Sequence, residues 1–241
     1  MKVLVITDIH SNLAALRAVL EAAAPFDKVW CTGDIVGYGP EPNECVEMLA
    51  GLPLRATAGN HDLGALGKLP LQVFNPAARA ALRWTADALT RESIQFLESL
   101  PRTLVTDDTL LCHGSPREPV WEYLFSPFQA ENSFPVFAQQ LCLVGHTHLP
   151  AVFRKAGGAA CEQVPWDPPV LTIEEGLRFI LNPGSTGQPR DGDHRASFAV
   201  YLPDRHTVEN IRINYDFSLT QRKMSQAGLP QSLIDRLPWG L

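Results

Sequence analysis

An apolar segment at residues 29–32, followed directly by Gly33 and Asp34, most constrains the fold of this chain. The segment does not alternate between apolar and polar residues, so a strand formed here buries both of its faces, as parallel strands covered by helices do. In open α/β sheets, ligands bind at the carboxyl ends of the strands. We therefore expect a buried parallel strand that places the Asp34 carboxylate at the edge of a functional site.

Side chains that can bind metals follow four further apolar segments. The segments cover residues 3–7, 54–58, 109–112 and 141–144, and the side chains after them are Asp8, His10, Asn60, His113, His146 and His148. Of the seven histidines, only His194 and His206 stand outside such strand ends, since His61 follows Asn60. A single polar residue after a strand is usually a helix cap or a hydrogen-bonded core residue, whereas this repetition predicts one shared site.

The N-terminal residues predict a βαβ unit, followed by a less regular second half. A strand over residues 3–7 precedes a helix capped by Ser11 or Asn12 and a second, parallel strand over residues 28–32. Short strands predict an antiparallel second half, near residues 151–154, 170–173, 178–181, 197–201 and 208–213. The tail over residues 217–241 is expected to be helical, because it contains two short amphipathic stretches.

Length and composition predict a single globular domain over residues 1–241. The chain has 45% hydrophobic and 19% charged residues, and its net charge of −6 gives no overall basic field to attract nucleic acid or anionic lipid. The N-terminus reaches Asp8 too early for a secretory signal, and no segment approaches the about 18 apolar residues of a membrane span. The five cysteines are widely spaced, which predicts core thiols in a reducing compartment. We expect a cytoplasmic protein that binds neither membrane nor nucleic acid.

The order and spacing of the five motifs resemble those of the calcineurin-like metallophosphoesterase superfamily over residues 1–202. The motifs are Asp8-Ile9-His10, Gly33-Asp34, Gly59-Asn60-His61-Asp62, His113-Gly114 and Gly145-His146-Thr147-His148. Residues 182–191 resemble the small, single-domain bacterial phosphodiesterase-like branch of that superfamily. The resemblance implies a four-layered α/β/β/α sandwich with a mixed two-sheet core and a two-metal site at the strand ends.

The resemblance also implies how two divalent ions would be held. One ion would bind Asp8, His10, Asp34 and His148, and the other Asp34, Asn60, His113 and His146, with Asp34 as the bridge. Carboxylate, imidazole and amide ligands suit Mn²⁺, the expected ion, as well as Fe²⁺, Co²⁺, Ni²⁺ or Zn²⁺. Two such ions can hold a hydroxide that attacks phosphorus in line. His61 resembles the acid that protonates the leaving oxygen, and Asp62 either supports that imidazole or caps a helix.

The expected substrate is a small phosphodiester or nucleotide-like molecule. The stretches around Asp34 and Asn60 lack the two arginines with which Ser/Thr protein phosphatases clamp a phosphomonoester dianion. We therefore favour a diester, whose single charge the metals can neutralise. Tyr38 is the expected lining residue, because it lies in the glycine-rich loop just after Asp34.

Several alternatives stay open at the level of the sequence. Arg190 either contacts the substrate or forms an ion pair with Asp191 or Asp193. The aromatic segment 121–137 either packs within the fold, which we favour, or walls the site. The segment 229–241 docks on its own chain or on a neighbour, so both a monomer and a homodimer are compatible. The alternative functions are a phosphomonoesterase resembling protein phosphatases and a non-catalytic scaffold, while the acidic balance argues against a nuclease.

Overall fold

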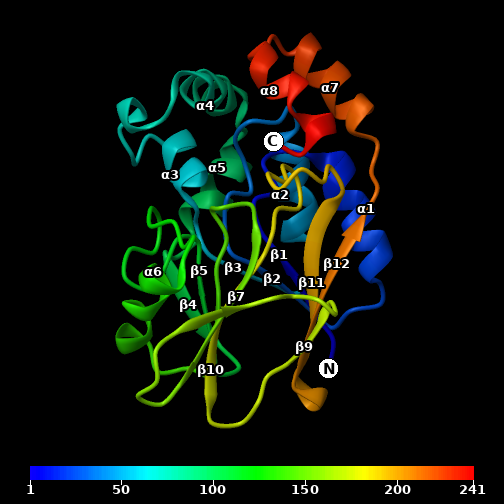
Figure 1. Ribbon diagram of the computed structural model, residues 1–241. Coiled ribbons are helices and arrows are strands. Elements are labelled where there is room, and N and C mark those ends of the chain that lie inside the picture. The colour runs from blue at the N-terminus through cyan, green and yellow to red at the C-terminus, as the bar shows by residue number, and fades with distance from the viewer.

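Strand β1 (Val3–Ile6) lies inside the first of two six-stranded sheets in the computed structural model, which describes residues 1–241 (Figure 1). Helix α1 (Leu13–Ala23) connects it to the parallel strand β2 (Lys28–Cys31), which confirms the βαβ unit. Helix α2 (Pro42–Ala50) then leads to β3 (Leu54–Ala56), which is parallel to β2. On the other side of β1 the sheet continues with antiparallel pairings through β11 (Ala196–Leu202), β12 (Thr207–Ile213) and β9 (Val170–Thr172).

The second sheet is mixed. Its strands, in order across the sheet, are β4 (Thr103–Thr106), β5 (Thr109–Cys112), β6 (Leu141–Leu143), β10 (Leu177–Pro183), β7 (Pro150–Ala156) and β8 (Glu162–Val164). The expectation of an antiparallel second half is wrong at one place, because β10 pairs in parallel with β6, with Phe179 opposite Leu141. The chain returns to β10 only after a long excursion through β7, β8 and β9, which lets β10 run in the same direction as β6.

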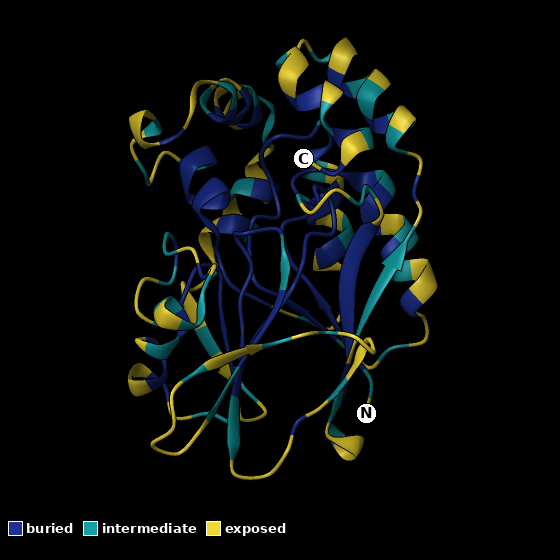
Figure 2. Ribbon diagram, in the orientation of Figure 1, coloured by how far each residue is buried: buried dark blue, intermediate teal, exposed yellow.

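Both faces of the central strands are buried, which explains the uninterrupted apolar segments. In β1, Val3 and Val5 point into the core between the two sheets, whereas Leu4 and Ile6 face the helices that cover the first sheet. Trp30 of β2 is fully buried in the core between the sheets. Figure 2 shows these strands as the buried interior, with the exposed residues on the outer helices and loops. Burial of each such side chain contributes about 1.5–3 kcal/mol to stability.

Helices cover the outer faces of the two sheets and complete the four layers. Helices α1, α2, α4 (Pro76–Ala88) and α5 (Arg91–Glu98) contribute to the core on the outer face of the first sheet. On the outer face of the second sheet, α6 (Pro127–Glu131) is followed by Phe134 and Phe137, which are buried together with Cys112 and Val144. The expected α/β/β/α sandwich is therefore the observed fold. None of the helices combines the length and the apolar character that crossing a membrane requires.

The C-terminal tail packs on its own chain. It forms α7 (Phe217–Gln226), α8 (Gln231–Asp235) and the 3₁₀ helix η4 (Leu237–Trp239), and α7 lies beside α1 (Figure 1). Leu233, Ile234 and Leu237 are buried in the core between the helices and the first sheet. The Thr220 hydroxyl donates a hydrogen bond of 2.9 Å to Asn12 at the N-terminus of α1. The tail is thus docked on the sandwich by both apolar and polar contacts.

Candidate metal centre

Five strands end at one edge of the molecule, and the loops after them hold all of the predicted metal ligands. Three of these loops follow β1, β2 and β3 of the first sheet, and two follow β5 and β6 of the second. The ligand side chains are at most 3% exposed: Asp8, His10, Asp34, Asn60, His113, His146 and His148. Six of them form two groups, in each of which the potential metal-binding atoms lie within 4.8 Å of one another. The residues selected by sequence pattern are therefore together in space.

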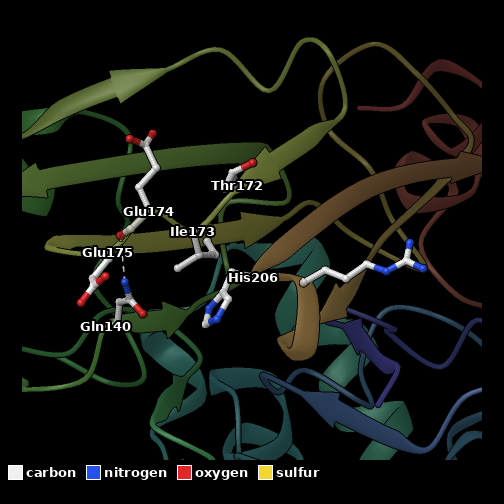
Figure 3. Close-up of a pocket in the computed structure, with 7 residues that line it drawn as sticks. Gln140, Thr172, Ile173, Glu174, Glu175 and His206 are labelled. Carbon is white, nitrogen blue, oxygen red and sulfur yellow. Dashed lines mark hydrogen bonds between the residues drawn. The ribbon is translucent and has the colours of Figure 1, made fainter.

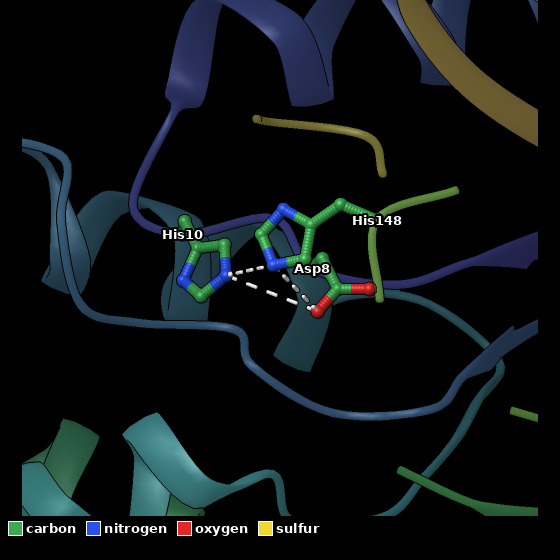
Figure 4. A group of neighbouring side chains, drawn as sticks. All are labelled: Asp8, His10 and His148. Atoms are coloured by element: carbon green, nitrogen blue, oxygen red, sulfur yellow. Dashed lines mark hydrogen bonds and ion pairs between the residues drawn. The ribbon is translucent and has the colours of Figure 1, made fainter. Parts of the chain in front are cut away.

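Asp8, His10 and His148 form the first group (Figure 4). Nε2 of His148 lies 3.4 Å from Asp8 Oδ1, and Nε2 of His10 lies 3.8 Å from the same oxygen. The two Nε2 atoms are 3.2 Å apart. The other ring nitrogens face backbone carbonyls: His10 Nδ1 lies 3.2 Å from that of Val36, and His148 Nδ1 lies 2.6 Å from that of Gln188.

These contacts determine the tautomers of both imidazoles. Because a carbonyl only accepts hydrogen bonds, each Nδ1 carries and donates the proton, which leaves a lone pair on each Nε2. Burial holds the pKa of His10 and that of His148 well below the usual value, so neither Nε2 carries a proton at neutral pH. Two imidazole lone pairs thus converge on an Asp8 oxygen, and burial raises the pKa of Asp8 to about 7. A divalent cation fits this donor set.

Asp34, His113 and His146 form the second group, and Asn60 adjoins it. His113 Nε2 lies 3.3 Å from Asp34 Oδ2, 3.0 Å from Asn60 Oδ1 and 3.1 Å from His146 Nδ1. His113 Nδ1 faces the carbonyl of Thr32 at 3.0 Å, so its ring is oriented in the same way as the rings of the first group. A carboxylate, an amide oxygen and two imidazoles suit the same class of divalent cation.

Asp34 stands between the two groups. Its Oδ2 lies 3.6 Å from His10 Nε2 and 3.3 Å from His113 Nε2, so one oxygen faces an imidazole of each group. Burial acts to raise the pKa of Asp34, but the nearby imidazoles of His113, His61 and His10 together hold that pKa below its usual range. Burial likewise opposes protonation of His113, yet Asp34 raises the pKa of His113 to about 9. The negative charge of the buried Asp34 carboxylate therefore favours a positive charge, such as that of a bound cation, beside it.

The backbone is strained at most of the predicted ligands. Asp8, His10, Asp34, His146 and His148 adopt left-handed conformations, with φ between 49° and 68°. Such a conformation costs a residue other than glycine about 1 kcal/mol or more. Each strand turns sharply at its end, and the turns direct these side chains to a common point. Strained backbone of this kind is concentrated at functional sites.

Two glycines let the strand ends approach one another closely. A Cβ atom at Gly59 would lie 2.0 Å from Asp34 Oδ1. One at Gly145 would lie 2.1 Å from Thr7 Oγ1 and 2.8 Å from Asp8 Oδ2. A larger residue at either position would displace a predicted metal ligand, since protein interiors leave no room for such overlaps.

His61 lies next to the first group, on the short helix α3 (Asn60–Ala65). Its ring packs against Tyr38, His10 and Phe74, with distances between ring centroids of 4.3, 4.8 and 5.3 Å. Its Nδ1 is buried without a hydrogen-bond partner, and burial lowers its pKa to about 4. Tyr38 also lies 4.7 Å from the His10 ring, so the predicted proton donor and the predicted lining residue occupy one side of the metal centre.

Asp62 makes the contacts of a helix cap. Its two carboxylate oxygens accept hydrogen bonds from the backbone N–H groups of Val36 and Gly59, at 3.0 and 2.9 Å. These bonds tie the loop after β2 to the loop after β3, and no hydrogen bond joins Asp62 to the His61 ring. Of the two interpretations of Asp62, the geometry corresponds to capping.

Arg190 lies in the loop after β10 and reaches the Tyr38 hydroxyl, 3.5 Å from its Nη2. Arg190 does not form the ion pair with Asp191 or Asp193 that was the alternative expectation. Asp191 pairs with Arg212, and Asp193 pairs with Arg195. The Arg190 side chain is thus directed toward the site rather than toward its acidic neighbours in the sequence.

An aromatic stack begins at the second metal-binding group and extends outward. The Tyr123 ring stacks on His146 with 3.8 Å between centroids, and Phe125 continues the stack at 5.3 Å from Tyr123. Tyr123 is 38% exposed and Phe125 54%. The favoured interpretation of segment 121–137 as packing holds for Phe134 and Phe137 but misses this stack. The clustering of aromatic residues was the available signal, and it does not distinguish buried rings from exposed ones.

A separate cavity of about 620 Å³ lies at the opposite end of the strands (Figure 3). Gln140 directly precedes β6, and Thr172 pairs with Thr207 at the start of β12. Both positions are at the end of the sheets away from the metal-binding loops, because β6 runs toward those loops and β12 runs in the same direction as β1. None of the residues that line this cavity belongs to either metal-binding group.

Comparisons with known proteins agree with this geometry. The model of the calcineurin-like phosphoesterase superfamily domain matches residues 1–205. The chain is 38% identical over 240 residues to an uncharacterized protein of Methanocaldococcus jannaschii, over 97% of this chain and 96% of that protein. A solved metallophosphoesterase from Sphaerobacter thermophilus is 46% identical, with a TM-score of 0.89 and coverage of 100% of both chains. A hypothetical protein from Pyrococcus horikoshii, 22% identical with a TM-score of 0.81 over 100% of this chain and 98% of its own, shares the fold. The chain belongs to the calcineurin-like phosphoesterase superfamily.

Proposed function

We propose that the protein is a phosphodiesterase that depends on two divalent metal ions, with Mn²⁺ as the expected ion, and hydrolyses a small phosphodiester. The observation that carries this proposal is the single Asp34 oxygen that faces an imidazole of each metal-binding group. Membership of the superfamily supports phosphoester hydrolysis. When bound, two such ions polarise a phosphoryl oxygen, activate water and neutralise the charge that develops on the phosphate.

The proposed ligands divide as the two groups do. One ion would be held by Asp8, His10, Asp34 and His148, and the other by Asp34, Asn60, His113 and His146. The backbone carbonyls of Thr32, Val36 and Gln188 accept hydrogen bonds from the Nδ1–H groups of three imidazoles and so direct each Nε2 toward the position of a cation, which would replace the Nε2 proton of His113.

His61 is the proposed proton donor to the leaving oxygen. Its ring is held beside His10 by packing against Tyr38 and Phe74, so it is positioned next to the first metal-binding group. Burial lowers the pKa of His61 to about 4 in the site without ions or substrate, and a phosphate anion bound next to the ring would act to raise it, as a nearby negative charge does. Asp62 is proposed as a positioning residue, because it holds the loops that carry Asp34 and His61.

Charge and shape support a diester over a monoester. The loops after β2 and before α3 contain no arginine, so a second negative charge on the scissile phosphate would find no guanidinium there. The exposed rings of Tyr123 and Phe125 offer a surface on which a planar substituent of the diester can stack. Such stacking is worth about 1–3 kcal/mol when the substituent is a nucleobase.

The test of this proposal combines metal analysis with two ester substrates. After reconstitution with Mn²⁺, we expect about two ions per chain and faster hydrolysis of bis-p-nitrophenyl phosphate than of p-nitrophenyl phosphate. Asp34→Asn should lower diester turnover by about 100-fold or more, whereas Asp87→Asn, at an exposed position on α4, should leave it unchanged. Faster hydrolysis of the monoester would replace the proposal with a phosphomonoesterase, and a chain that binds no metal would overturn it.

A second experiment tests His61 through the leaving group. p-Nitrophenolate leaves without a proton, whereas phenolate needs one more, so a proton donor matters most for diphenyl phosphate. We expect His61→Ala to lower kcat for diphenyl phosphate by about 10²–10⁴-fold, with a smaller loss for bis-p-nitrophenyl phosphate and an unchanged metal content. Equal losses for both substrates would exclude His61 as the donor, and a loss of metal would make it a ligand or a structural residue.

A further inference from the structure

Two arginines from distant parts of the chain meet at the Tyr38 ring. Arg190 comes from the loop after β10, and Arg236 lies between α8 and η4 in the C-terminal tail. Cζ of Arg236 lies 4.7 Å from the centroid of the Tyr38 ring, and Cζ of Arg190 lies 5.8 Å from it. Each guanidinium is therefore within the range of a cation–π contact with the same ring.

Neither guanidinium has an acidic partner. No carboxylate oxygen lies within 4.0 Å of Arg190 or Arg236, whereas the neighbouring Asp191 and Asp193 pair with Arg212 and Arg195. Burial and the positive charge of Arg190 both lower the pKa of Arg236, which shows that the charge of Arg236 is poorly compensated. Both side chains are half-buried, and a charge removed from water without a counter-charge is costly, so an anion bound here would be favoured.

Several N–H groups of this pair are also free. Nε and Nη2 of Arg236 and Nε of Arg190 are buried and have no hydrogen-bond partner. Arg190 Nη2 is occupied, because it donates 3.0 Å to Gln188 Oε1 and lies near the Tyr38 hydroxyl. The unpaired donors are therefore guanidinium N–H groups, whose planar arrangement matches the oxygens of a phosphate.

The pair is built into the fold at the border of the metal centre. Tyr38, on which both guanidiniums stack, packs against the rings of His10 and His61. The end of the tail is fixed to the loop of Arg190 by a 3.0 Å hydrogen bond from the Gly192 N–H to the Gly240 carbonyl. On either side of Arg236, the apolar residues Leu233, Ile234 and Leu237 hold the tail in the core. The position of Arg236 is thus set by packing rather than by an ion pair.

We propose that Arg190 and Arg236 form an anion subsite that binds a second phosphate group of the substrate, beside the phosphodiester that is hydrolysed. The substrate class is then a phosphodiester that carries an additional phosphomonoester on one of its substituents. This inference rests on the proposed phosphodiesterase function. The arginines reach the metal centre only across Tyr38, so they fit a group next to the scissile phosphate rather than the scissile phosphate itself. The subsite lies beside His10, whereas the aromatic stack begins at His146 of the other metal-binding group.

The test compares two substrates that differ only in the second phosphate. They are the p-nitrophenyl ester of thymidine 5′-phosphate, with and without a phosphate on the 3′-oxygen, and both release p-nitrophenolate. With the Mn²⁺-loaded protein we expect kcat/KM to be at least about tenfold higher for the 3′-phosphorylated substrate, equivalent to about 1.4 kcal/mol, and the gain to lie mainly in KM. Equal kcat/KM values for the two substrates would overturn the subsite.

Variants separate recognition from a general disturbance of the tail. Arg236→Gln and Arg190→Gln should each reduce the ratio of the two kcat/KM values to about one, and Arg236→Lys should restore part of it because it returns the charge. Arg222→Gln, at an exposed position on α7 in the same tail, should keep the full ratio. If Arg236→Gln lowered kcat/KM for both substrates equally and left their ratio unchanged, Arg236 would be a structural residue and the proposal would be wrong.

A binding measurement distinguishes failure of the subsite from failure of the proposed function. Calorimetric titration of the Mn²⁺-loaded protein should show at least about tenfold tighter binding of thymidine 3′,5′-bisphosphate than of thymidine 5′-monophosphate, and Arg236→Gln should remove the difference. Arg236-dependent binding without any diester hydrolysis would keep the subsite and overturn the phosphodiesterase. Hydrolysis of diesters with no preference in either assay would keep the phosphodiesterase and overturn the subsite.

Discussion

The backbone at Gly145 passes so close to Asp8 that a methyl group added at Gly145 would displace the Asp8 carboxylate. A Cβ atom there would lie 2.8 Å from Asp8 Oδ2 and closer still to Thr7 Oγ1. We expect Gly145→Ala to displace Asp8, to lower the Mn²⁺ content measured by elemental analysis, and to cost about 1–3 kcal/mol of stability. Gly158→Ala is the control, because a Cβ atom at Gly158 meets nothing within 4 Å. Unchanged metal content in Gly145→Ala would contradict this view of the site.

The five cysteines differ in accessibility, and the difference predicts their reactivity. Four are buried, and Cys161 alone is partly exposed. Burial and the nearby Glu131 raise the pKa of Cys161 to about 11, which keeps its thiol protonated at neutral pH. Because the thiolate is the reactive form, alkylation by iodoacetamide should be slow at pH 7 and should accelerate about tenfold per pH unit toward pH 10. Mass spectrometry should find one label, on Cys161, and none in Cys161→Ser. Native-state labelling of several cysteines would contradict the burial of the other four.

Individual residues of the site differ in how far the sequence could predict them. The convergence of Asp8 and Asp34 was predictable, because each follows an apolar strand and the carboxyl ends of parallel strands share an edge. His113 follows a strand of the second sheet, so its place beside them came from the family resemblance. The contacts of Tyr123 with His146 and of Arg236 with Tyr38 were not predictable. These contacts join loops and a tail that are far apart in the sequence, and no local pattern records which distant ring a side chain meets.

At the scale of elements, Asn12 joins three segments while it caps helix α1. Its Oδ1 accepts hydrogen bonds from the Ala15 N–H at 3.2 Å and from the Thr220 hydroxyl of α7 at 2.9 Å. Its Nδ2 donates 2.8 Å to the Gly187 carbonyl in the loop after β10. We expect Asn12→Ala to lower the free energy of unfolding by about 2–4 kcal/mol, since it removes a cap and leaves two buried partners unsatisfied.

Asn75→Ala provides the matched comparison, because Asn75 caps α4 through a single hydrogen bond to the Ala78 N–H. We expect Asn75→Ala to lower the free energy of unfolding by about 1 kcal/mol. Urea unfolding of both variants in the presence of a chelator keeps metal binding out of the comparison. Equal decreases in the free energy of unfolding of the two variants would mean that the contacts of Asn12 with α7 and with the loop after β10 do not stabilise the folded chain.

The order and type of most elements could be predicted, but some directions and ends could not. The βαβ unit and the hairpin of β4 and β5 follow from local periodicity and turn residues. Strand β3 ends at Ala56 rather than at Ala58, because the Ala58 N–H turns to the carbonyl of Pro101 instead of continuing the sheet. The parallel pairing of β10 with β6 depends on the path of the intervening chain, which local periodicity does not contain.

At the scale of the whole molecule, the candidate metal centre joins the two sheets. Asp8 and His10 follow β1 of the first sheet, whereas His148 follows β6 of the second, and the second group is divided in the same way. Ions bound there connect the layers and bind only the folded chain, so they stabilise it by mass action. We expect Mn²⁺ at about 100 times its dissociation constant to add about 2.7 kcal/mol for one site, seen as a higher Tm than in chelator.

Asp34→Asn should lose most of this rise in Tm, and Asp87→Asn should keep it. A Tm that does not change with Mn²⁺, in a protein shown to contain the ion, would mean that the centre does not link the sheets in the folded state.

The position of β1 also sets the order in which the molecule can be completed during synthesis. One edge of β1 pairs with β2, which follows soon after it, but the other edge pairs with β11, with Val3 opposite Tyr201. Until residues 196–202 leave the ribosome, the first strand of a nascent chain has an open edge that other chains can pair with. Contacts between residues so far apart in sequence also slow folding. The nascent chain is therefore most prone to aggregate late in translation, when most of the sandwich has emerged from the ribosome but β11 has not.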